Sequence, residues 1–120
     1  WRRHKEYWTK MKLYLDTSTP QTILRLDETE YRIDLGNQLA EKLLQVLHQK
    51  LQENHADWTD ISEITFMAGP GSFTGLRIGA AIVNTLADQL DIPLYKSTGE
   101  QVPVILPDYG RPANITPPKK

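Results

Sequence analysis

The residues best suited to chemistry form a glycine-rich segment, Gly69-Pro-Gly-Ser-Phe-Thr-Gly-Leu-Arg-Ile-Gly79. Glycine permits a positive φ and a close approach of the backbone, and a glycine-rich turn that enters a helix can offer its N–H groups to a phosphate. The segment is not a Walker loop, because no Gly-Lys-Ser/Thr closes it, and three residues separate Gly71 from Gly75, which excludes the dinucleotide fingerprint. A tight structural turn is favoured over an anion site built from Gly69, Gly71 and Ser72.

A second polar turn, Asp16-Thr-Ser-Thr19, follows the first predicted strand. Asp16, Thr17 and Ser18 could contact a metal-bound phosphate. The same residue types also form Asx and Ser/Thr turns that cap hairpins. Because the sequence supplies no second wall for a cleft, capping is the favoured interpretation.

Other catalytic chemistry finds no support in the residue pattern. The chain has no cysteine, and its three histidines, His4, His48 and His55, show no spacing typical of metal ligands. His48 is predicted to be solvated on a helix surface, and Trp58 to be a core or cap residue. We therefore expect no catalytic residue, no metal and no cofactor in this chain.

Length and composition point to one domain with a real core, since the chain has 120 residues of which 39% are hydrophobic. A net charge of −1 argues against direct binding of nucleic acid. The apolar runs are far shorter than the roughly 20 residues of a membrane span, and no secretory signal is predicted. We expect a cytoplasmic protein that does not enter a membrane.

The element pattern predicts an α/β fold with a mixed five-stranded sheet and two main helices. Three strands over 12–15, 22–26 and 31–35 form an antiparallel meander, and Asn37 is the expected N-cap of a helix that runs to about residue 54. A strand over 61–68, a helix to about residue 90 and a strand over 92–96 predict a parallel β-α-β unit. We divide the chain into an extension at 1–10, a folded lobe at 11–98 and a proline-rich, extended tail at 99–120.

Both predicted helices have apolar arcs wider than one sheet needs. The arcs measure about 160° and about 200°, against the roughly 100° stripe that seats a helix. A helix buried in its own small domain would also show such an arc, but a short chain has little material to cover it, and exposed apolar patches usually mark interfaces. We predict a helix-pairing interface formed by Leu39, Leu43, Val46, Leu47, Gly75, Ile78, Gly79, Ile82 and Leu86.

Two motifs carry a family resemblance. Met11-Lys-Leu-Tyr-Leu-Asp-Thr-Ser-Thr19, followed by a leucine-rich helix and then by Ile64-Thr-Phe-Met-Ala-Gly-Pro-Gly-Ser-Phe-Thr-Gly-Leu-Arg-Ile-Gly79, resembles the TsaB (YeaZ) family. These proteins are accessory subunits of bacterial tRNA threonylcarbamoyladenosine synthesis. The resemblance covers residues 11–98 and implies a single actin-like, RNase H-like lobe, the first of the family's two lobes. Gly36-Asn37-Gln38 departs from the family's histidine-containing turn.

The resemblance also implies partners. Family members pair through the two helices of this lobe with TsaD, the ATP-dependent catalytic subunit, or with themselves, and TsaE joins the assembly. This chain would be a non-catalytic subunit, homodimeric when alone, that acts indirectly on adenosine 37 of tRNA, while ATP and metal bind to TsaD. The alternative is a homodimeric, nucleotide-binding or ATPase-like domain. It is disfavoured, because actin-like ATPases enclose their nucleotide between two lobes.

Overall fold

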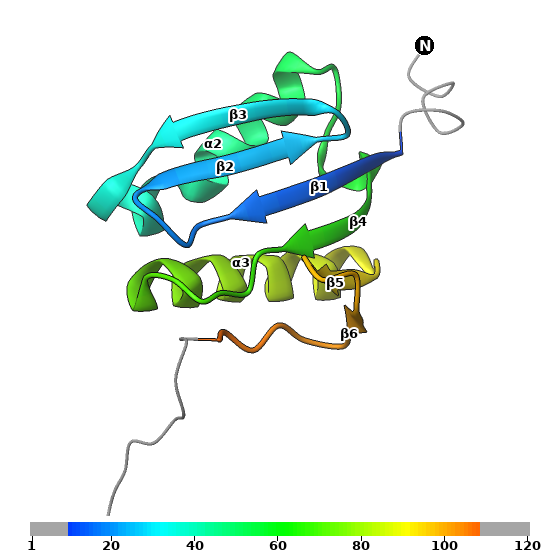
Figure 1. Ribbon diagram of the computed structural model, residues 1–120. Coiled ribbons are helices and arrows are strands. Elements are labelled where there is room, and N and C mark those ends of the chain that lie inside the picture. The colour runs from blue at the N-terminus through cyan, green and yellow to red at the C-terminus, as the bar shows by residue number, and fades with distance from the viewer. Residues whose placement is uncertain (1–9, 109–120) are drawn as a thin grey trace, which may run out of the picture.

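The computed structural model describes residues 10–108, so the predicted extension and the end of the tail lie outside the described residues. A sheet of six strands forms the body of the lobe, in the order β3-β2-β1-β4-β5-β6 (Figure 1). The strands are β1 (Met11–Asp16), β2 (Gln21–Leu26), β3 (Thr29–Asp34), β4 (Ile61–Phe66), β5 (Leu94–Lys96) and β6 (Gln101–Val102). The first three form the predicted antiparallel meander, and β4 and β5 run parallel to β1.

The predicted count of five strands is wrong by one, because β6 returns antiparallel to β5. Gly99 makes this return possible with a φ of +98°, a conformation that glycine adopts without strain. The Lys96 N–H then donates to the Glu100 carbonyl oxygen at 2.9 Å. A strand of two residues is too short to show a period in the sequence.

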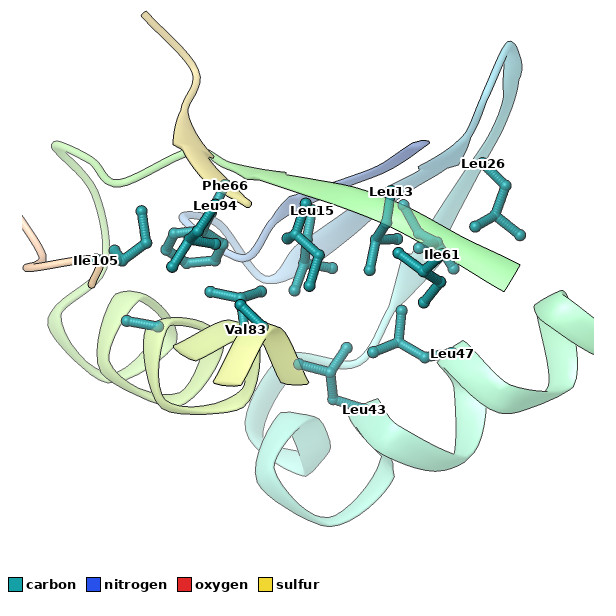
Figure 2. Packing of buried hydrophobic residues seen from close by; sticks show 14 of the residues in the cluster. Leu13, Leu15, Leu26, Leu43, Leu47, Ile61, Phe66, Val83, Leu94 and Ile105 are labelled. Carbon is teal, nitrogen blue, oxygen red and sulfur yellow. The ribbon is translucent and has the colours of Figure 1, made fainter. Parts of the chain in front are cut away.

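Both helices, α2 (Leu39–Glu53) and α3 (Phe73–Leu90), cover the same face of the sheet (Figures 1 and 2). Figure 2 shows Leu43 and Leu47 of α2 and Val83 of α3 pointing toward strand side chains such as Leu15 and Ile61. All five are at most 2% exposed. A fully buried aliphatic side chain contributes about 1.5–3 kcal/mol, so this layer holds the helices on the sheet.

Asn37 is not the N-cap of α2, contrary to the prediction. It lies within a 3-10 turn, η2 (Gly36–Gln38), and Gln38 is the N-cap residue without a side-chain cap bond. Gly36 opens this turn with a φ of +50°. The Leu39 N–H, the first of α2, donates to the Gly36 carbonyl oxygen, so η2 leads directly into the helix.

The packed lobe continues past Thr98 and reaches Asp108. Ile105 is 1% exposed, and its backbone makes two bonds to the amide of Asn84 on α3. Its N–H donates to Asn84 Oδ1 at 2.7 Å, and its carbonyl oxygen accepts from Nδ2 at 3.1 Å. The Asp108 N–H donates to the Ala68 carbonyl oxygen at 2.7 Å. Residues 103–108, which belong to the predicted tail, therefore include contacts with α3 and with the turn before it.

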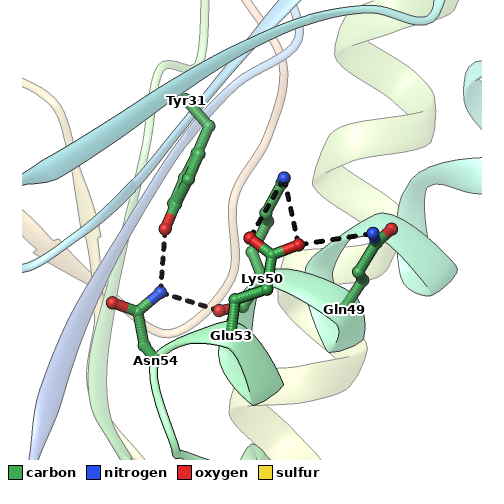
Figure 3. A network of polar contacts seen from close by, with 5 residues as sticks. All are labelled: Tyr31, Gln49, Lys50, Glu53 and Asn54. Carbon is green, nitrogen blue, oxygen red and sulfur yellow. Dashed lines mark hydrogen bonds and ion pairs between the residues drawn. The ribbon is translucent and has the colours of Figure 1, made fainter.

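The end of α2 is tied to the edge strand β3 by a small polar network (Figure 3). Asn54 Nδ2 donates to the Tyr31 hydroxyl at 2.9 Å and to the Lys50 carbonyl oxygen at 2.8 Å. The Lys50 ammonium lies 4.7 Å from the centre of the Tyr31 ring and 3.3 Å from the Glu53 carboxylate. The Lys50–Glu53 pair lies within α2, so the Asn54–Tyr31 bond and the Lys50–Tyr31 contact are what join the helix end to β3.

Candidate functional site

An uncharged groove runs between α2 and α3 on the side away from the sheet. Its volume is about 590 Å³. The short turn η3 (Trp58–Asp60), between α2 and β4, supplies one wall. The lining residues are Leu44, Trp58, Ala81, Ile82, Thr85, Leu86, Gln89 and Leu90. Leu44 is 49% exposed, and contiguous exposed apolar surface of this kind is typical of an interaction site.

The structure places only part of the predicted interface at this groove. Ile82 and Leu86 line it. Val46 and Ile78 are partly buried against the core, and Ile78 lines a different pocket. Each of the four retains some exposed surface.

Leu39, Leu43 and Leu47 are wrong as interface residues, because they face the sheet and are 5%, 0% and 1% exposed. Gly75 and Gly79 are also buried. A Cβ on Gly79 would lie 2.2 Å from Thr17 Oγ1, and one on Gly75 would lie 2.1 Å from the Thr17 carbonyl oxygen. These glycines allow α3 to approach its own sheet and first turn, and they do not serve another helix.

Six groove residues were missed by the sequence prediction, and Trp58 is the most informative of them. Its ring stacks on His48 with centroids 5.5 Å apart and planes 8° apart. His48 Nε2 lies 3.4 Å from Asp57 Oδ1. His48 is therefore partly covered, and Trp58 packs on the core edge while it also lines the groove. Leu44 and Leu90 had a signal in the apolar arcs, but Trp58 lies between elements, where periodicity gives no direction.

The candidate phosphate residues are engaged with one another. Asp16 Oδ1 accepts from the Ser18 N–H at 2.9 Å and from the Ser18 hydroxyl at 2.6 Å, which is an Asx-type turn. The Thr17 hydroxyl donates to the Gly75 carbonyl oxygen at 2.7 Å. The Ser72 hydroxyl caps α3 by accepting from the Gly75 N–H at 3.1 Å.

The two loop glycines fit the same structural role. A Cβ on Gly71 would lie 2.5 Å from the Ser18 Cβ, and one on Gly69, whose φ is +122°, would lie 2.0 Å from the Asp108 carbonyl oxygen. These contacts support the interpretation of both segments as structural turns. Phosphate binding by these residues stays a prediction.

A second pocket, of about 370 Å³, lies between the starts of α2 and α3. No charged side chain contributes to its lining, and the polar side chains that do are Thr17, Thr19, Thr22, Asn37, Ser72 and Thr74. The Thr22 hydroxyl is fully buried and has no hydrogen-bond partner in the protein. Within residues 10–108, no group of three or more His, Asp or Glu side chains is placed to hold a metal ion.

The face of the sheet opposite the helices carries Tyr14 on β1. The Arg25 guanidinium lies 4.2 Å from the centre of its ring. Burial raises the pKa of the Tyr14 phenol above its ordinary value of 10.0, and the Asp16 carboxylate raises it further, while Arg25 opposes the shift. This hydroxyl stays neutral at physiological pH.

Several known proteins are similar to this chain. A family model described as "TsaD: tRNA N6-adenosine threonylcarbamoyltransferase" matches residues 35–97. The tRNA threonylcarbamoyladenosine biosynthesis protein TsaB of Bacillus subtilis is 36% identical over 87 residues, which are 68% of this chain and 38% of that protein. The Haemophilus influenzae TsaB is 32% identical over 87 residues, 68% of this chain and 36% of that protein. The solved structure of YeaZ from Pseudomonas aeruginosa has a TM-score of 0.68 at 30% identity, over 72% of this chain and 43% of that chain.

The two helices on one face of a mixed sheet define an α/β lobe of the fold found in tRNA threonylcarbamoyladenosine proteins. Within this class, the chain belongs to the TsaB (YeaZ) family. It spans about two fifths of the length of the relatives it matches. None of the helices described between residues 10 and 108 could cross a membrane.

Proposed function

We propose that this lobe is a non-catalytic accessory subunit that binds TsaD through the groove between α2 and α3, and so supports threonylcarbamoylation of adenosine 37 in tRNA. The groove itself is the main support for this role. It is about 590 Å³ in volume, lined mainly by apolar side chains and by no charged one. Such a surface gains most by burial against another apolar surface.

The family model supports the choice of partner. The model is named for TsaD and matches residues 35–97, a range that includes both helices and the Trp58 turn. A TsaD partner would therefore carry a comparable pair of helices. Two like surfaces can pair about a two-fold axis, and the same argument allows a homodimer when the chain is alone. TsaE and tRNA would join through TsaD, in the cytoplasm.

The polar residues support an accessory role over catalysis. One solved relative from Pseudomonas aeruginosa is described as similar to peptidase YEAZ. A peptidase needs an activated nucleophile or a bound metal. The hydroxyls of Thr17, Ser18 and Ser72 are all engaged in turn and cap bonds. ATP and metal would bind to TsaD.

Sedimentation equilibrium of the chain with and without TsaD tests this proposal. We expect a one-to-one complex with TsaD, and self-association of the chain alone at about 100 μM, a concentration that corresponds to weak binding near −5 to −6 kcal/mol. Absence of a complex with TsaD at this concentration would contradict the proposal. A homodimer that forms without any binding to TsaD would favour the alternative, a homodimeric, nucleotide-binding or ATPase-like domain.

A further inference from the structure

Trp58 supplies the wall of the groove that comes from outside the two helices. It begins η3, and it lines the groove together with Leu44 of α2 and Ile82, Leu86 and Leu90 of α3. One side of Trp58 packs on the edge of the core, and the residue remains only partly buried. Trp58 therefore joins the core of the lobe to the open surface of the groove.

The carboxylate of Asp57 fixes the position of Trp58 and of the ring that stacks on it. Asp57 Oδ1 accepts the Trp58 N–H at 2.8 Å and lies 3.4 Å from His48 Nε2. The Asp57 N–H in turn donates to Asp60 Oδ2 at 2.8 Å, which completes a capping box around η3. The imidazole of His48 stacks on the indole with planes 8° apart, so the Asp57 carboxylate lies close to both members of the stack.

We infer that Trp58 is the anchor residue of the groove and that His48 and Asp57 are positioning residues for it. This inference rests on the proposed function and commits to TsaD as the occupant. Tryptophan is among the residues most enriched where binding energy concentrates, and a ring held from behind loses little freedom on binding. The remaining lining is aliphatic, small or amide-bearing, so Trp58 is the group that distinguishes one apolar partner surface from another.

The positioning role can be tested in the chain alone. Replacing Trp1 and Trp8 by phenylalanine leaves Trp58 as the single tryptophan, and its near-ultraviolet circular dichroism then reports the order of the ring. We expect His48→Ala to lose most of this signal and His48→Phe, which keeps a flat ring, to retain it. Gln45→Ala, on the exposed side of α2, is the matched control. An unchanged signal in His48→Ala would overturn the positioning role.

The anchor role requires TsaD. In calorimetric titration we expect Trp58→Ala to weaken binding about tenfold or more, as an anchor residue does. His48→Ala should weaken it about threefold or more, and His48→Phe should restore it. Trp58→Leu keeps an apolar side chain on the core edge and replaces Trp58→Ala if that variant does not fold, with the same loss expected.

Failure of the inference and failure of the proposed function give different results. If the unsubstituted chain binds TsaD and Trp58→Ala or Trp58→Leu binds within twofold of it, the anchor role is overturned and the docking groove stands. If the unsubstituted chain does not bind TsaD at all, the proposed function and the anchor role are overturned together.

Discussion

The hydroxyl of Thr17 donates a 2.7 Å hydrogen bond to the carbonyl oxygen of Gly75, which lies 58 residues further along the chain. This bond joins the turn after β1 to the glycine-rich turn that opens α3. Close to it, the Ser72 N–H donates to the Ser18 carbonyl oxygen at 2.9 Å. The two motifs that stand out in the sequence are thus halves of one structural unit, which sets the position of α3 and therefore of the groove.

Gly79→Ala should destabilise the lobe. The added Cβ would lie 2.2 Å from Thr17 Oγ1 and 2.6 Å from the Phe66 ring, both buried. Overpacking of this kind costs about 1–3 kcal/mol, which urea unfolding can measure. Thr85→Ala, at an exposed position of α3, should stay within about 0.5 kcal/mol. Equal stability of Gly79→Ala and the unsubstituted chain would show that the packing at this glycine is loose.

Thr22→Val and Thr17→Val should have opposite effects on stability. The Thr22 hydroxyl is buried without a partner, so its replacement by a methyl group should be neutral or stabilise by up to about 1–2 kcal/mol. The Thr17 hydroxyl is buried and bonded to Gly75, and its loss should cost about 1–3 kcal/mol. A clear loss of stability in Thr22→Val would mean that its hydroxyl has a partner after all, such as an ordered water molecule.

Tyr14 should make stability fall at high pH. The pKa of its phenol is above 10.0 in the folded state, so the unfolded chain releases the proton first. The unfolded state is then favoured as pH rises above about 10, whereas below that pH both states keep the proton and Tyr14 adds no pH dependence to the stability. Urea unfolding between pH 8 and pH 11 should show a smaller decline in Tyr14→Phe than in the unsubstituted chain. Equal losses of stability in Tyr14→Phe and the unsubstituted chain would contradict a raised pKa of Tyr14.

Nucleotide should bind weakly to the chain alone. The turns at Asp16 and Gly69 are engaged with each other, and high affinity normally requires a pocket that encloses most of the ligand. Calorimetry with ATP and Mg²⁺ should give a dissociation constant above about 10 μM, corresponding to less than roughly 7 kcal/mol of binding energy, and no hydrolysis. A tighter constant, or turnover of ATP, would revive the ATPase-like alternative.

Sequence periodicity could predict the elements but not the direction in which a wide apolar arc faces. The meander, the two helices and the β4-α3-β5 unit follow from alternation and from the 3.6-residue period. Leu43 and Leu44 both belong to the arc of α2, yet Leu43 is 0% exposed and Leu44 is 49% exposed. Which of the two leucines is buried depends on where the sheet packs against α2, and the helical period does not show this.

The positions of Trp58 and Ile105 could not be predicted from the sequence, because they depend on contacts between distant segments. Trp58 reaches the groove because Asp57 and His48 hold it there, and this arrangement depends on α2 and η3 lying side by side. Likewise, Asn84 recruits Ile105 into the packed lobe across 21 residues. Such pairings leave no periodic trace in the chain.

The affinity of Ile82→Glu for TsaD, compared with the folding of Val83→Glu, tests whether TsaD docks in the groove between α2 and α3. Ile82 lines the groove, while its neighbour Val83 is 0% exposed in the core. Ile82→Glu should keep the fold, and in the complex it would bury an unpaired carboxylate at a cost of several kcal/mol. We predict a loss of affinity for TsaD of about 100-fold or more, whereas Val83→Glu should not fold. An Ile82→Glu variant that folds and binds TsaD with unchanged affinity would show that TsaD does not dock in this groove.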